Sequence, residues 1–98
     1  MEKRTPHCPL DRLQTLLSQG KVRTTQAAAL GARSLGLGPY DMLDVVRRLS
    51  PGDFHKSMTS YHDHRVWQDV YRAQTAVGSV YLKLTVVDDL LIVSFKEL

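Results

Sequence analysis

The spacing of apolar residues changes once along this chain, near residue 60. Before that point apolar residues recur every three or four positions, as on one face of a helix. After it they alternate with polar residues, as in a strand that has one buried face. Because helices come first and strands second, the pattern predicts an α+β fold. The N-terminal helices would pack on one face of a C-terminal antiparallel sheet.

Three helices are predicted in the first half of the chain, over residues 10–20, 24–38 and 39–50. Gly20 follows the last leucine of the first helix, a position where glycine often ends a helix. Thr24 and Thr25 can each cap the start of the second helix. The third helix has a single apolar stripe, made of Met42, Val45, Val46 and Leu49.

The sequence SPGD at residues 50–53 predicts the start of one more, short helix. Ser50 can cap it, Pro51 fits its first turn, and Asp53 suits the positive end of the helix dipole. We expect this helix to carry Phe54 inward and to expose His55 and Lys56.

Three strands are predicted after residue 60, over residues 66–73, 79–87 and 90–96, with a turn at 88–89. A short extended segment at 21–23 can add an edge strand. In the second strand one face is apolar, and the other carries Tyr81, Lys83 and Thr85. In the third, alternation puts Leu91, Val93 and Phe95 on one side. It puts Ile92, Ser94 and Lys96 on the other.

For the strand at 66–73, alternation does not show which face is buried. Gln68 and Arg72 share a face with two valines, whereas Trp67, Asp69 and Tyr71 share the opposite face. Periodicity alone leaves open which face is buried. If Gln68 and Arg72 face outward, they join Tyr81, Lys83 and Lys96 on the sheet face that the helices leave free.

Size and composition predict one domain over residues 1–98, because a chain this short can form only one hydrophobic core. The single cysteine, Cys8, excludes an intramolecular disulfide and suits a reducing compartment. There is no signal-peptide pattern and no run of about 18 apolar residues, so we expect a cytoplasmic protein without a membrane partner.

The net charge of +3 is mildly basic and is compatible with a nucleic-acid partner. The excess lies in residues 1–53, which carry eight Lys and Arg against five Asp and Glu. Residues 54–98 carry five of each. A nucleic-acid site in the second half must therefore depend on local arrangement rather than on bulk charge.

The polar residues of the second half could cleave RNA without a metal ion. Such a site must accept a proton from the 2′-hydroxyl, neutralise the phosphate and donate a proton to the leaving 5′-oxygen. A suitable set is Lys56, Gln68, Arg72, Tyr81 and Lys96. Most basic sheet surfaces offer similar groups, so the pattern by itself favours a solvated polar face.

Other chemistries have weaker support. His62 and His64 could lie on one side of an extended segment as metal ligands, but no third ligand has a recognisable spacing. Neither Cys8 nor any glycine-rich segment matches a nucleophile or phosphate-loop pattern. His55, next to Lys56, could transfer protons near neutral pH, although the pattern favours an ordinary surface histidine.

Six segments spread over the whole chain carry a more specific signal. They are MEKRTPH, VRTT, DFHKSMT, WQDVYR, VYLKLTV and LIVSFKE, in this order and without an obvious insertion. With these segments the chain resembles the MqsR-type mRNA interferase toxins. The resemblance implies a RelE-like fold and a toxin that arrests growth by cutting single-stranded mRNA at short GC-containing triplets, with no cofactor and no metal ion.

The resemblance also implies a partner. The cognate antitoxin of this family has a zinc-bearing N-terminal domain and a helix-turn-helix domain that binds DNA. Any zinc would therefore belong to the partner, and contact with DNA, as in transcription regulation, would be only indirect.

The family's catalytic positions match Lys56, Gln68, Tyr81 and Lys96. Met58 and Arg72 correspond to RNA-binding positions, and we add His55 and Lys83 as candidates on the same face. The resemblance places Gln68 and Arg72 toward the RNA, and Trp67 and Tyr71 toward the helices.

The chain departs from the family pattern at two positions. His55 stands where tyrosine is expected, and Asp88 stands where relatives can carry histidine. We expect these differences to affect triplet preference and rate more than the type of reaction.

Two alternatives from other classes stay open. One is a catalytically silent RNA- or protein-binding module that uses the same basic face or an exposed sheet edge. The other is a metal hydrolase that uses His62 and His64.

Overall fold

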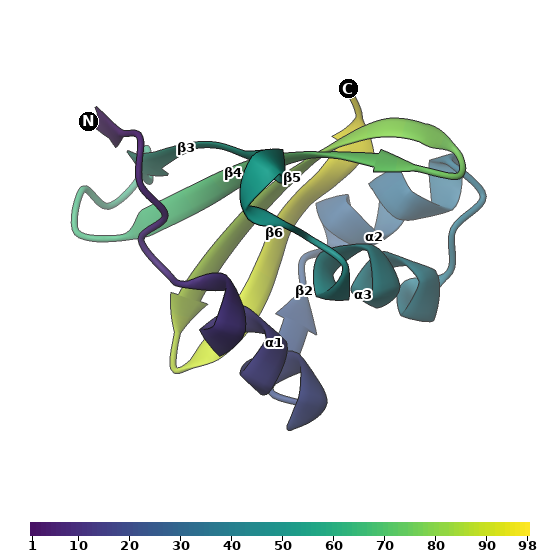
Figure 1. Ribbon diagram of the computed structural model, residues 1–98, viewed down its shortest axis with the longest axis horizontal. Helices are drawn as coiled ribbons and strands as arrows, with labels where there is room; N and C mark the ends of the chain where they lie inside the picture. The colour runs from purple at the N-terminus through teal and green to yellow at the C-terminus, as the bar shows by residue number, and fades with distance from the viewer.

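The computed structural model describes residues 1–98 and contains one six-stranded sheet with three helices (Figure 1). The strands are β1 (Glu2–Lys3), β2 (Val22–Thr24), β3 (Phe54–Thr59), β4 (Trp67–Thr75), β5 (Gly78–Val87) and β6 (Asp89–Glu97). The helices are α1 (Leu10–Ser18), α2 (Gln26–Ser34) and α3 (Pro39–Arg47). The order in the sheet is β1-β3-β4-β5-β6-β2, antiparallel except where β2 runs parallel to β6. The predicted α+β class is confirmed.

All three helices lie on the same side of the sheet (Figure 1). Between the layers lies one apolar core, to which the helices contribute residues such as Leu13, Ala28 and Val46 and the sheet contributes Leu82 and Phe95. Full burial of a side chain such as leucine or phenylalanine contributes about 1.5–3 kcal/mol, so this layer contact is the main source of stability. The helices leave the other face of the sheet uncovered, and we call it the outer face.

The helix predictions are confirmed in place and in their end signals. Gly20 follows α1 with φ +73°, a conformation that glycine adopts without strain. The amide of Lys21 then donates to the carbonyl of Leu16 at 2.9 Å, which closes the end of the helix. At the start of α2 the Thr25 hydroxyl accepts a hydrogen bond from the amide of Ala28 at 3.1 Å.

The short helix predicted after Ser50 is wrong beyond its first turn. A single 3₁₀ turn spans Pro51–Asp53, and residues from Phe54 onward form strand β3. Lys56 therefore lies in a strand and not at the end of a helix. The strand escaped prediction because its inward positions are Ser57 and Thr59, buried polar residues that break the apolar alternation.

The predicted faces of the last strand are also wrong in part. The register between β5 and β6 shifts, because Lys83 pairs with Ser94 whereas Leu84 pairs with Ile92, and Val93 is the extra residue. This bulge lets both Ile92 and Phe95 face the core, although three positions separate them. The carbonyl of Val93 accepts a hydrogen bond of 2.8 Å from the Thr25 hydroxyl at the start of α2.

Candidate functional site

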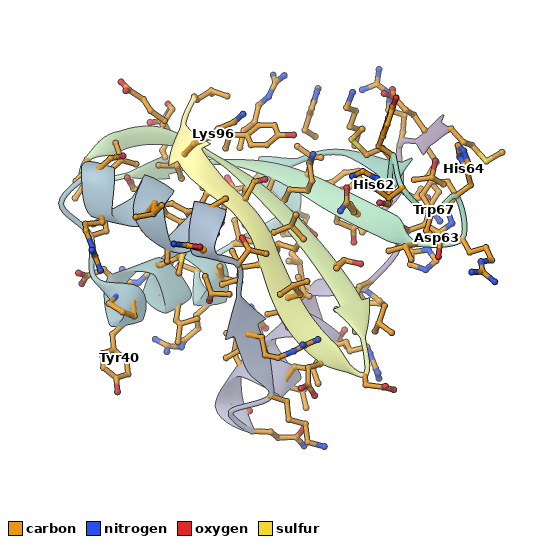
Figure 2. The ribbon with its side chains drawn as sticks, turned by 180° about the vertical axis from the view of Figure 1, so that it is seen from behind. Tyr40, His62, Asp63, His64, Trp67 and Lys96 are labelled. Carbon is orange, nitrogen blue, oxygen red and sulfur yellow. The ribbon has the colours of Figure 1, made fainter.

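The pairing of strands β3 to β6 brings the predicted site residues together on the outer face of the sheet. Directly paired residues of neighbouring strands point to the same face. The pairs that carry site residues are Met58 with Gln68, Lys56 with Val70, Val70 with Lys83, Arg72 with Tyr81, and Tyr81 with Lys96. In Figure 2 Lys96 lies on the upper side of the sheet, and Tyr40, on α3, lies far below it.

The central row of this face is Lys56, Val70 and Lys83, on three adjacent strands. Val70 has 0% exposure, although no helix covers it. The residues paired with it on either side are lysines, and long aliphatic stems of this kind can cover a valine while their charged ends reach water. The ambiguity of β4 is resolved because Tyr71 belongs to the core, so Gln68 and Arg72, on the opposite side of the strand, lie on the outer face.

The next row contains Arg72, Tyr81 and Lys96. The Lys96 ammonium lies 5.1 Å from the centroid of the Tyr81 ring, a cation–π contact. Arg72 Nη2 lies 3.0 Å from His55 Nε2. A bulge between Phe54 and Lys56 brings His55 to this row.

The pKa of His55 lies below its ordinary value of 6.5. Partial burial is the main cause, and the positive charges of Arg72 and Lys56 add to it. The lowered pKa favours the neutral ring at pH 7, whose Nε2 can accept the hydrogen bond that Arg72 donates.

A residue missed in the sequence, Glu2, also lies on this face. Its Oε2 atom is 2.7 Å from the Nζ atom of Lys56. The hydrogen bond and the charge of Lys56 lower the pKa of Glu2. Nothing in the sequence indicated this pair, because 54 positions separate the two residues and β1 has only two residues.

The opposite face of β4 holds Trp67, Asp69 and Tyr71. Tyr71 is fully buried in the core between sheet and helices, as predicted, and it also makes an edge-to-face contact with Phe54. Trp67 also points away from the outer face, but the N-terminal segment covers it and not a helix. The Lys3 ammonium lies 4.2 Å from the centroid of its ring, and the His7 ring stacks on it at 5.7 Å.

The histidines of the β3–β4 loop form no metal-binding group. No cluster of three or more His, Cys, Asp or Glu side chains in the chain could hold a metal ion. Asp63 lies between His62 and His64 in this loop (Figure 2). Its carboxylate accepts a hydrogen bond of 3.1 Å from Arg65, and this contact lowers the pKa of Asp63.

Two hollows lie away from the outer face. One, of about 390 Å³, lies between α3 and the β4–β5 hairpin, and its lining includes Val45, Arg48 and Val77. The other, of about 460 Å³, lies near the start of α3 and is lined mainly by small and apolar residues. Neither contains a predicted site residue. No helix of the chain is long and apolar enough to cross a membrane.

The fold and the outer face define a class of protein: a small α+β domain with lysine, arginine, tyrosine and glutamine grouped on an open sheet surface. The family described as "Motility quorum-sensing regulator, toxin of MqsA" matches residues 5–97 of this chain. The chain belongs to this family. It is 56% identical over 97 residues to "mRNA interferase toxin MqsR" of Escherichia coli (strain K12), an alignment that covers 99% of each chain.

Proposed function

We propose that this chain is an mRNA interferase toxin, an endoribonuclease that cleaves single-stranded mRNA at short GC-containing triplets without a metal ion. Membership of the toxin family and the high identity to a relative named as an mRNA interferase support the activity. The single structural observation that carries the proposal is the convergence of Lys56, Gln68, Tyr81 and Lys96 on one open face.

The reaction we propose is an attack of the 2′-hydroxyl on the neighbouring phosphorus. A new bond forms between the 2′-oxygen and phosphorus, the bond to the 5′-oxygen breaks, and one proton moves from the attacking to the leaving oxygen. Lys56 and Lys96 neutralise the phosphate or transfer a proton, Tyr81 transfers a proton or contacts the phosphate, and Gln68 orients the RNA. Each well-placed acid or base contributes about 10²–10⁴-fold in rate.

RNA binding is assigned to the residues that surround this set, which are Met58, Arg72, His55 and Lys83. Arg72 and Lys83 attract the phosphate backbone, and the exposed edge of Met58 can contact a base. The departure at Asp88 lies in the turn between β5 and β6. Tyr81 and Lys96 lie toward the other end of that hairpin, so Asp88 affects the choice of triplet more than the chemistry.

We also propose that a cognate antitoxin neutralises the activity. The family description names the toxin as that "of MqsA", which supports such a partner. The antitoxin would carry a zinc-bearing N-terminal domain and a helix-turn-helix domain, and DNA would be contacted only through the complex.

The test is incubation of the purified protein with one defined transcript in excess EDTA, followed by mapping of the cut ends. Discrete cuts at a recurring triplet are expected. RNA that is retained without being cut would instead identify a silent binding module. Activity that EDTA removes would indicate a metal hydrolase and would overturn the metal-independent mechanism.

A further inference from the structure

The N-terminal segment is held along the edge of the sheet by several independent contacts. Strand β1 pairs with β3, with Glu2 opposite Met58 and Lys3 opposite Ser57. Further along, the carboxylate of Asp69, only 3% exposed, accepts hydrogen bonds of 2.9 Å from the backbone amides of residues 7 and 8. The segment is therefore a fixed part of the structure and not a loose end.

This anchoring places Glu2 on the outer face. The residue opposite it, Met58, points to that face, so the Glu2 side chain does as well. Lys56 lies two positions from Met58 on the same face, within diagonal reach, and the two charged groups meet at 2.7 Å. The Lys56 side chain is 26% exposed, whereas the Glu2 side chain is 54% exposed.

A carboxylate on a face that binds RNA repels phosphate and therefore disfavours binding. Its contact with Lys56 explains why a carboxylate lies there. A lysine ammonium sits on a flexible four-carbon stem, and a free lysine samples many positions. A fixed carboxylate holds the ammonium in one place before the substrate arrives, which is how enzymes gain rate from orientation.

We propose that Glu2 is a positioning residue, which acts on the scissile phosphate only by orienting the ammonium group of Lys56. This inference rests on the proposed endoribonuclease function and deepens it. Lys56 keeps the pKa of Glu2 below its ordinary value, and Arg4 and the N-terminal amino group add to this effect. The carboxylate therefore stays ionised across the neutral range in which RNA cleavage is measured.

The test is single-turnover cleavage of a short single-stranded RNA by the untagged protein, with rate and RNA affinity measured separately. Glu2→Gln is expected to lower the cleavage rate about 10- to 100-fold, the effect of a misplaced catalytic group. RNA binding should stay the same or tighten about 2- to 5-fold, because one repulsive charge is gone. Glu2→Asp, which keeps the charge on a shorter stem, should recover part of the rate.

Glu97→Gln is the matched control. Glu97 lies at the end of β6 and takes part in none of the ion pairs of the structure. Its substitution changes the net charge equally and should leave the rate unchanged. If Glu2→Gln cleaves at the wild-type rate, or if rate and affinity fall together, the positioning role is wrong while the nuclease stands. If the wild-type protein itself does not cleave, the proposed function fails instead.

Discussion

The backbone of Gly31, in α2, touches the backbone of Phe95, in β6, with no room for a side chain between them. A Cβ atom at residue 31 would overlap the carbonyl oxygen of Phe95. Glycine within a helix is unfavourable by about 1 kcal/mol relative to alanine, so its presence here reflects this close approach. The contact sets the distance between α2 and the strand that carries Lys96.

Gly31→Ala is therefore expected to destabilise the protein, although alanine is the better helix former. Overpacking of this kind lowers the free energy of unfolding by about 1–3 kcal/mol, and the thermal midpoint should fall by roughly 5–20 °C. Thermal unfolding followed by circular dichroism measures the change. Gly52→Ala is the control, because a Cβ there would meet only the Ser50 Oγ atom at 3.9 Å. Equal midpoints for the two variants would contradict the close contact.

Tyr71→Phe is expected to stabilise the protein. The Tyr71 hydroxyl is fully buried and has no hydrogen-bond partner. An unsatisfied buried polar group costs about 1–3 kcal/mol, and phenylalanine removes it while keeping the ring against Phe54. The thermal midpoint should rise by several degrees without loss of RNA cleavage. A lower midpoint would mean that the hydroxyl has a partner in solution.

Lys56→Ala, Gln68→Ala and Tyr81→Ala should each abolish growth arrest when the protein is expressed. Their side chains lie on the outer face and not in the core, so the free energy of unfolding should stay within about 1 kcal/mol of wild type. Growth after induction and thermal unfolding of the purified variants measure the two effects. A triple variant that arrests growth as strongly as the parent would show that the site is misassigned.

The pKa of His55, measured by NMR titration of its ring, should lie below 6.5. Arg72→Gln should raise it only part of the way, because partial burial and not Arg72 is the main cause. The unfolded chain binds this proton more readily than the folded one, so stability falls as the pH drops below about 6.5. His55→Gln should weaken that dependence. A pKa at or above 6.5 would exclude the environment described for the ring.

The elements that could be predicted from the sequence are those whose buried positions are apolar. Leu13 and Met42 mark their helices, and Val80 and Leu82 mark β5, because the core selects hydrophobic residues at the period of each element. Strand β3 was missed since Ser57 occupies a fully buried position there.

Which residues share the outer face could be predicted in large part, but the distances and contacts between them could not. Alternation placed Tyr81, Lys83 and Lys96 on one face, and the family resemblance placed Gln68 with them. No local pattern could reveal the bulge at Val93, whose carbonyl accepts a hydrogen bond from the distant residue Thr25. The Glu2–Lys56 contact depends on strand pairing between distant segments, which no local pattern records.

The outer face draws on residue 2 at one end of the chain and residue 96 at the other, with β6 inside the sheet between β5 and β2. A polypeptide that is still being translated lacks this last strand and the core contacts of Phe95. The proposed site therefore assembles only after β6 has inserted between β5 and β2, because a shorter polypeptide has neither Lys96 nor the core contacts of Phe95.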